Sequence, residues 1–247
     1  MTAEPNHASL CLVTAVDIEF KTAVNLLSQT ASSTESGFKI CQGLFGNRNV
    51  TVLQCGMGAR GFAEWLKDHL KASDYEALII VGLAGGLDPK LKAGDVVIYD
   101  LCRDGQTQQR ISCDSYLGES LHEALQPSSL RAFRGTGITV SRIITDATDK
   151  LRLGKSQQAM AVDMESFGIL RVSAELGFPA AAVRVISDEA EHALPDFNEA
   201  VEASGKMNPW RLAAAMLRRP VASVRFLANI KPVINALRES LQVILSV

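Results

Sequence analysis

The stretch DMESFGILRVSAELGFPAAAVRVISDE, residues 163–189, decides the fold class because it joins a helix pattern to a buried strand. Residues 163–177 have apolar side chains at helical spacing and acids in the first turn, and Gly177 followed by Pro179 marks the end of this helix. Residues 180–186 form a continuous apolar run, which is typical of a strand buried on both faces. The stretch therefore predicts a helix–strand unit of an α/β protein.

One charged residue, Arg184, interrupts this apolar run, and Ser187 and Asp188 follow where the strand ends. Burial of a charge without a partner is costly, so the sequence calls for an acid close to Arg184. Ligands of α/β sheets bind beyond the carboxyl ends of the strands, and this is the position of Ser187 and Asp188.

Outward from this unit, strand and helix patterns alternate. This alternation predicts a three-layer α/β/α sandwich with a mixed central sheet, in a single domain over residues 1–247. The pattern predicts strands at 10–16, 77–86, 94–102, 134–144 and 180–186, a hairpin over 38–55 that turns at Gly46-Asn47, and helices at 18–29, 61–71 and 163–177.

Residues 209–247 form an apolar and basic extension with a helical pattern. Two interpretations stay open at this point. The helices either close the domain, or they form a surface that meets a membrane or a greasy substrate.

Composition limits the function further. The 247 residues are 47% hydrophobic and 21% charged with a net charge of −2, which fits a globular domain and argues against bulk nucleic-acid binding. Five scattered cysteines without a CxxC pair favour a reducing cytoplasm over a disulfide framework or zinc site. Residues 1–6 lack the basic start of a signal peptide, and no run of about 18 apolar residues could span a membrane.

A glycine-rich turn, CGMGARG at 55–61, matches the dinucleotide-binding pattern G-x-G-x-x-G. That function also needs an acid at the end of the next strand, but the strand at 77–86 ends in glycines. We therefore interpret the glycines only as a tight turn with close backbone approach. No organic cofactor or metal is expected.

Four short stretches carry candidate chemistry: TAVDIEF (14–20), GLAGGLDPKLKAGDVV (82–97), VDMES (162–166), which opens a helix, and VRVISDE (183–189). Each feature also has a structural explanation, since acids favour helix starts, Ser-Asp can cap a helix, and glycine turns follow many strands. Their joint placement at strand ends favours a site.

These motifs resemble the nucleoside phosphorylase/nucleosidase superfamily, and most closely its methylthioadenosine/S-adenosylhomocysteine nucleosidase branch. The resemblance covers about residues 10–200 and rests on the last three stretches quoted above. It implies a purine nucleoside as substrate, cleavage of the N-glycosidic bond, and a homo-oligomer without a cofactor.

The resemblance also assigns residue roles. Asp188 would protonate or hydrogen-bond N7 of the leaving base, Glu165 would bind the ribose hydroxyls, and Glu19 would activate the attacking water. Arg184 would lie near this nucleophile with Glu19 as its partner. The other implied substrate contacts are Ser187 beside the acid, Met164 on the sugar face, Asp163 and Gly85, and the backbone near Ile143 and Ile144 at the base.

Some positions depart from that branch. Leu83 stands where nucleosidases carry a small hydroxyl residue, and no arginine of a phosphate clamp is evident, although Arg60 and Arg142 could substitute. Leu83, a compact 100–115 segment and the 209–247 extension resemble instead the hopanoid-associated phosphorylase-like group, which is proposed to remove adenine from a lipid-linked adenosine.

Three functions therefore stay open. The first is a nucleosidase that uses water on a 5′-modified adenosine. The second is a phosphorylase that forms a sugar 1-phosphate, and the third is a non-catalytic nucleoside-binding module, against which the acid Asp188 argues. The extension also leaves open a peripheral membrane contact of an otherwise cytoplasmic protein.

Overall fold

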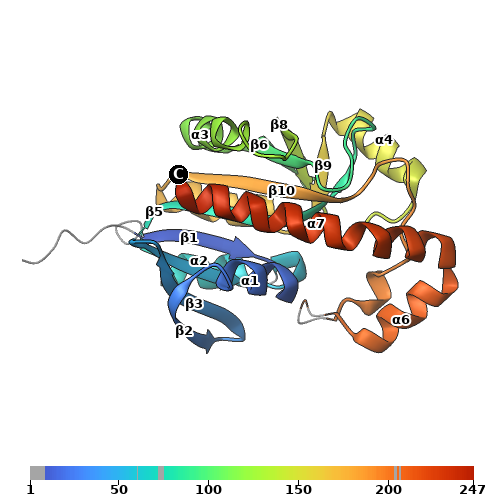
Figure 1. The fold of residues 1–247 in the computed structure, drawn as a ribbon. Coiled ribbons are helices and arrows are strands. Elements are labelled where there is room, and N and C mark those ends of the chain that lie inside the picture. The colour runs from blue at the N-terminus through green and yellow to red at the C-terminus, as the bar shows by residue number, and fades with distance from the viewer. Residues whose placement is uncertain (1–8, 60, 72–74, 203–204, 206) are drawn as a thin grey trace, which may run out of the picture.

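The computed structural model describes residues 9–59, 61–71, 75–202, 205 and 207–247. Within these residues, ten strands join in one mixed sheet with helices packed on both of its faces (Figure 1). The three-layer α/β architecture predicted from the sequence is therefore confirmed.

The centre of the sheet is parallel. β5 (Tyr75–Gly86) lies between β1 (Ser9–Thr14) and β10 (Ala180–Asp188), and β4 (Arg48–Gln54) follows on the far side of β1. These four strands run in the same direction, so their carboxyl ends lie at the same edge of the sheet. That edge is the expected position of a ligand site.

The two flanks of the sheet differ. On one side, β3 (Phe38–Phe45) and the edge strand β2 (Ser28–Glu35) continue antiparallel from β4. On the other side, β6, β8 and β9 connect β10 back to β5, so this part of the sheet closes into a ring. The strands of this side are β6 (Val96–Asp104), β7 (Arg110–Ser112), β8 (Ala132–Thr139) and β9 (Ala161–Asp163).

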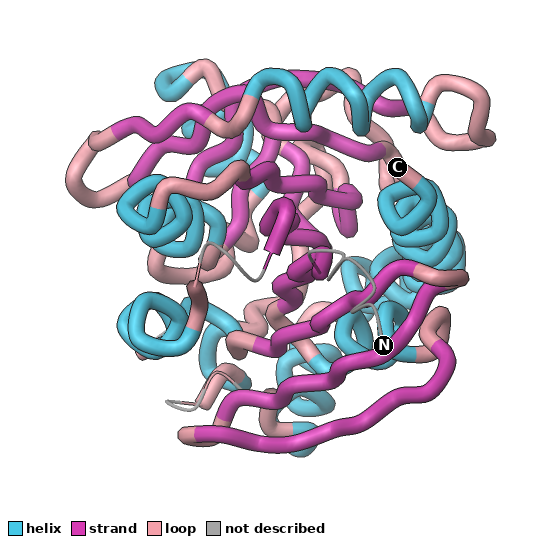
Figure 2. The backbone as a smooth tube through the Cα atoms, turned by 90° about the vertical axis from the view of Figure 1, so that its left-hand side faces the viewer, coloured by secondary structure: helices cyan, strands magenta, loops and turns pink. Residues whose placement is uncertain are grey.

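Two large apolar clusters fix the layers, because successive strand side chains point to opposite faces. One face packs against α1 (Asp17–Val24), α3 (Ser115–Leu125) and the second half of α7 (Pro220–Ser246). The other face packs against α2 (Phe62–His69) and α5 (Ser166–Leu176). Figure 2 shows the strands between these groups of helices. A third, smaller cluster lies under α4 (Ala147–Gln157).

Several elements differ from the sequence prediction. The strand expected over 134–144 ends at Thr139, and the helices α3 and α4 were not predicted. The helix expected over 18–29 ends at Val24, and the exposed strand β2 follows, whose polar sequence SQTASSTE shows no apolar alternation. The helix expected over 163–177 begins only at Ser166. Asp163 ends strand β9, and Glu165 occupies the N-cap position of α5, so the two acids lie before the first helical turn and not within it.

The C-terminal extension is helical, as predicted, and consists of α6 (Pro209–Arg218) and α7. The second half of α7 closes the core with buried residues such as Leu237 and Leu241. In contrast, α6 and the first half of α7 keep large apolar side chains exposed. No helix within the described ranges is long and apolar enough to cross a membrane.

Two glycines give a test of the packing between β6 and β8. A Cβ at Gly137 would lie 2.0 Å from Cε2 of the fully buried Tyr99, whereas one at Gly168 in α5 would have nothing within 4 Å. Gly137→Ala should lower the free energy of unfolding by about 1–3 kcal/mol through overpacking. Gly168→Ala, the matched control, should raise it by up to about 1 kcal/mol through helix propensity. Urea unfolding measures both, and equal midpoints for the two variants would contradict this packing.

Candidate active site

Polar side chains gather at the carboxyl ends of the parallel strands. Glu19 follows β1, Gly58 follows β4, residues 82–86 end β5, and residues 184–188 end β10. Glu19, Glu165 and Asp188 are all buried there, as is Arg184. Acids are rarely buried without partners, so the contacts of each one indicate what holds it in place.

The centre of the cluster is Arg184, which is only 1% exposed. Its Nε donates to Oδ2 of Asp163 at 3.1 Å, and its Nη2 donates to Oε2 of Glu165 at 3.3 Å. The Ser166 hydroxyl accepts from both nitrogens, at 3.2 and 2.9 Å. Burial acts to lower the pKa of Arg184, but Asp163 and Glu165 outweigh it and raise the pKa. Arg184 therefore carries a permanent positive charge inside the protein.

The expected partner of Arg184 was Glu19, and this prediction was wrong. Glu19 occupies the third position of α1 and folds back over the helix start. Its Oε2 accepts from the backbone N–H groups of Ala15 and Val16, and its Oε1 accepts from that of Leu83, at 2.7, 3.0 and 2.7 Å. Backbone donors thus take the contacts that were assigned to the guanidinium.

The environment of Glu19 favours a proton acceptor. Burial raises the pKa of Glu19, while Arg184 and the three backbone donors act to lower it. A carboxylate offers about four lone-pair sites, so three backbone bonds leave room for one further donor. Gly82 lets the carboxylate lie against β5, because a Cβ at this position would be 2.6 Å from Oε1.

Asp163 is bound entirely by its own protein surroundings. Its Oδ1 accepts from the Thr139 hydroxyl at 2.7 Å, and the Ser166 hydroxyl donates to Oδ2 at 2.5 Å. The backbone N–H groups of Glu165 and Ser166 add two further bonds. Burial acts to raise the pKa of Asp163, but Arg184 and the hydroxyls outweigh it and lower the pKa. This side chain holds the loop before α5, so its predicted contact with substrate stays a prediction.

Glu165 is held more loosely than Asp163. Among the described residues, its donors are Arg184 and the backbone N–H of Gly58, which lies 3.0 Å from Oε1. Burial raises the pKa of Glu165 to about 7, with Arg184 acting against it and Asp163 adding to it. Gly58 has a positive φ of 76° within the 55–61 turn, so the glycine motif orients an acid of the site. Met164 packs over this turn, with a distance of 3.8 Å from its Cε to a Cβ built at Gly58.

Asp188 ends β10 and lies beside Gly85, near the end of β5. The Ser187 hydroxyl donates to Oδ1 at 2.5 Å, and the Lys150 ammonium forms an ion pair with Oδ2. A Cβ at Gly85 would lie 3.5 Å from Oδ2, so the absence of a side chain at Gly85 keeps space beside the acid. Lys150 was not predicted as a site residue from the sequence. A signal existed in Gly154, which lies one turn later on the same buried face of α4 and indicates close packing.

The remaining candidates have different positions. Both backbone groups of Ile143 are bonded to the side chain of Asn198, at 2.9 and 3.0 Å, which leaves Ile144 as the better candidate for a base contact. Ile144 is half-buried. Arg142 is exposed, and Arg60 lies outside the described residues.

Known sequences show the family of the chain. A model of the Phosphorylase superfamily matches residues 9–218 of the chain. A 5′-methylthioadenosine/S-adenosylhomocysteine nucleosidase of Shewanella sp. (strain MR-7) is 26% identical over 214 residues, which cover 78% of this chain and 90% of the relative. The enzyme of the same name from Staphylococcus aureus (strain JH9) is 24% identical over 213 residues, covering 78% and 93%.

Solved structures show the same fold. The methylthioadenosine/S-adenosylhomocysteine nucleosidase of Neisseria meningitidis, in complex with methylthio-immucillin-A, superposes with a TM-score of 0.73 and 17% identity over 97% of this chain and 99% of its own. A futalosine hydrolase mutant of Helicobacter pylori superposes with a TM-score of 0.65 and 16% identity, over 73% and 90%. With a family match over most of its length and this fold, the chain belongs to the Phosphorylase superfamily.

Proposed function

We propose that this protein is an N-glycosyl hydrolase that cleaves a purine nucleoside, a 5′-modified adenosine, with water and releases adenine. The observation that carries the proposal is the set of three buried acids at one edge of the sheet, each in a different environment. The relatives named above, which are nucleosidases, support the same reaction class.

The three acids fit the demands of N-glycosidic cleavage. The transition state resembles an oxocarbenium ion, so the reaction needs a proton for the leaving base, an activated water on the other side, and contacts to the sugar. Glu19 and Asp188 approach β5 at Gly82 and Gly85. The two acids therefore reach β5 three residues apart, which is about 10 Å along the strand.

Glu19 is the proposed base. Burial raises the pKa of Glu19, which makes the carboxylate a better acceptor for the proton of the attacking water, and its backbone bonds fix the carboxylate before the reaction begins. Glu165 accepts hydrogen bonds from the ribose hydroxyls, with Met164 on the sugar face. Asp188, oriented by Ser187, acts at N7 of the purine beside Gly85.

Water rather than phosphate is the proposed nucleophile. An anion site needs cations that are free to bind it, but Arg184 and Lys150 are both committed to acids of the site. Leu83 presents its backbone N–H to Glu19 and packs partly against the apolar core. These contacts favour a hydrolase over the phosphorylase alternative.

The first experiment measures adenine release from a panel of 5′-substituted adenosines, in phosphate-free buffer and again with phosphate. The proposal expects release without phosphate and no stimulation by it. Asp188→Asn should keep nucleoside affinity within about threefold and lose at least about 100-fold in kcat, because general acid catalysis contributes that much. Release only with phosphate would make the protein a phosphorylase, and equal turnover by Asp188→Asn would reject the assigned acid.

A second prediction concerns the charge of Glu165. Its pKa of about 7 means that the carboxyl is mostly protonated at pH 6 and mostly ionised at pH 8. Only the ionised form offers all its lone pairs to two sugar hydroxyls, so affinity should rise with pH. In Asp188→Asn protein, the Kd of adenosine should fall up to about tenfold from pH 6 to pH 8.

The controls isolate the contact between the acid and the diol. The Kd of 2′,3′-dideoxyadenosine, which lacks both hydroxyls, should stay constant over this range, and Glu165→Gln should remove the pH dependence for adenosine. Equal pH dependence for the two ligands in calorimetric titrations would contradict the role of Glu165.

We propose that the 5′ substituent is a lipid, and that the C-terminal helices contact the membrane in which this lipid lies. An exposed apolar row runs along α6 and the first half of α7, with Trp210 84% and Leu217 81% exposed; Val221, Val224, Leu227 and Ile230 continue it. Arg225 and Lys231 follow Val221 and Leu227 by one turn on the same face of α7. Apolar and basic side chains together favour an anionic lipid surface.

Vesicle sedimentation tests this surface. The protein should sediment with vesicles that contain phosphatidylglycerol and much less with pure phosphatidylcholine vesicles. Leu217→Glu with Val221→Glu should reduce binding at least about tenfold, because two charges enter the apolar row. Tyr116→Glu is the matched control, since Tyr116 is equally exposed on the distant helix α3. Absence of binding, or self-association through the row instead, would contradict the membrane contact.

A further inference from the structure

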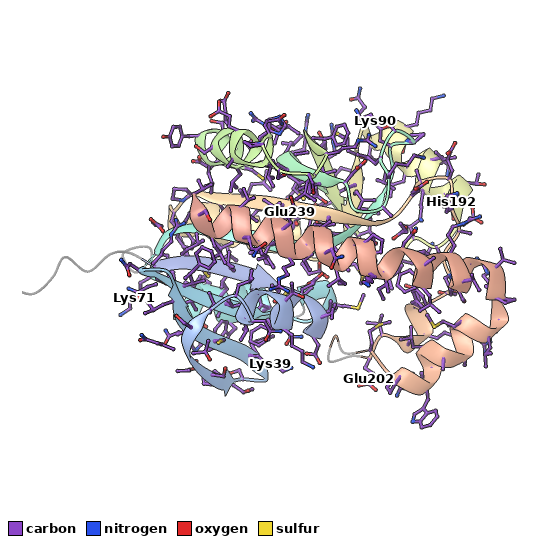
Figure 3. The ribbon with its side chains drawn as sticks, in the orientation of Figure 1. Lys39, Lys71, Lys90, His192, Glu202 and Glu239 are labelled. Atoms are coloured by element: carbon purple, nitrogen blue, oxygen red, sulfur yellow. The ribbon has the colours of Figure 1, made fainter. Side chains whose placement is uncertain are left out.

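Lys150 is a fully buried cation with three acceptors around its ammonium group. Its Nζ forms the ion pair with Oδ2 of Asp188 and donates to the backbone carbonyls of Glu189 and His192, at 3.2 and 2.8 Å. Figure 3 shows His192 at the end of the molecule that carries α4. A lysine ammonium has three donors and no acceptor, so these contacts match its charged form.

The partner of this ammonium is therefore a carboxylate. Asp188 accepts from Lys150 at one oxygen and from the Ser187 hydroxyl at the other, and Ser187 shares its hydroxyl with the carbonyl of Ala84. Both oxygens thus face donors in the free protein. An ionised carboxylate has no proton to give, so the acid at N7 needs a source of protons.

We propose that Lys150 is a positioning residue for the acid step, which holds the Asp188 carboxylate at the end of β10 and shares with it the proton that goes to the leaving purine. This inference rests on the proposed function. The ion pair and its neutral form, an amine beside a carboxylic acid, contain the same proton. The pair therefore holds, beside Asp188, a proton that can pass to the leaving purine.

The C1′–N9 bond breaks and its electron pair passes into the purine ring. A proton moves from Nζ of Lys150 to Oδ2 of Asp188, and Asp188 gives a proton to N7, so neutral adenine leaves and Asp188 is again a carboxylate. Water adds to C1′ and gives its proton to Glu19. Glu19 then releases this proton to solvent, and the Lys150 amine takes one up from solvent, so both groups return to their starting charge.

A purely structural role for Lys150 is the competing explanation, because the same ammonium ties the carbonyls of Glu189 and His192 to α4. Loss of that role would disturb binding and catalysis generally. Loss of the proposed role would act only through Asp188. A double-mutant cycle separates the two, since groups that act as one unit are not additive.

The experiment measures kcat and KM for adenine release by wild type, Lys150→Met, Asp188→Asn and the double variant. Lys150→Met should lower kcat at least about 100-fold with KM changed less than about threefold. In the Asp188→Asn background, Lys150→Met should lower kcat by less than about threefold. Lys155→Met is the control, because Lys155 lies exposed on the same helix, and it should match wild type. Near-ultraviolet circular dichroism checks that each variant is folded.

A second substrate keeps the inference testable if Lys150→Met is destabilised. A 4-nitrophenyl riboside has a leaving group that departs without a proton, so Lys150→Met and Asp188→Asn should both cleave it within about fivefold of wild type. Equal losses on both substrates, or multiplied losses in the double variant, would overturn the role of Lys150. Failure of wild type to release adenine would instead refute the proposed function, so the two failures are distinguishable.

Discussion

The arrangement of the site depends on one buried charge, Arg184. Its position on the central strand β10 places a guanidinium under the loop that enters α5, and the strands beside it exclude water. Such a charge is tolerated only with partners, and Asp163, Glu165 and Ser166 supply them. The ion pairs therefore tie the loop to the sheet and bring Glu165 to the edge where Glu19 and Asp188 already lie.

Three acids at one edge differ because their partners differ. Backbone N–H groups hold Glu19, the guanidinium and one glycine N–H hold Glu165, and an ammonium with a hydroxyl holds Asp188. Glycines at 58, 82 and 85 make the approach possible, since a side chain at Gly82 would collide with Glu19. In enzymes, neighbouring acids take different roles, one as acid and one as base, because their surroundings favour different charge states.

Local patterns predicted much of this structure. The apolar runs of β5 and β10 and the Gly177 cap are visible in the sequence, and so are the acids at the strand ends. Contacts between distant segments were not predictable. Several acids follow strands near the end of β10, so the sequence alone does not identify the partner of Arg184. In the structure Glu19 binds backbone N–H groups, and Asp163 and Glu165 pair with Arg184. Lys150 looks like any polar helix residue until the fold brings its side chain to Asp188 at the end of β10. The edge strand β2 lacks the apolar alternation by which strands are recognised.

The most direct test of the account is a crystal structure of the protein with a C-nucleoside analogue of adenosine, whose glycosidic bond cannot be cleaved. The account predicts the position-7 nitrogen within about 3.2 Å of an Asp188 oxygen, the ribose hydroxyls at a similar distance from Glu165, and a water between Glu19 and C1′. A purine bound away from Asp188, or a ribose whose hydroxyls face solvent, would contradict the central claim that these three acids form one site for N-glycosidic hydrolysis.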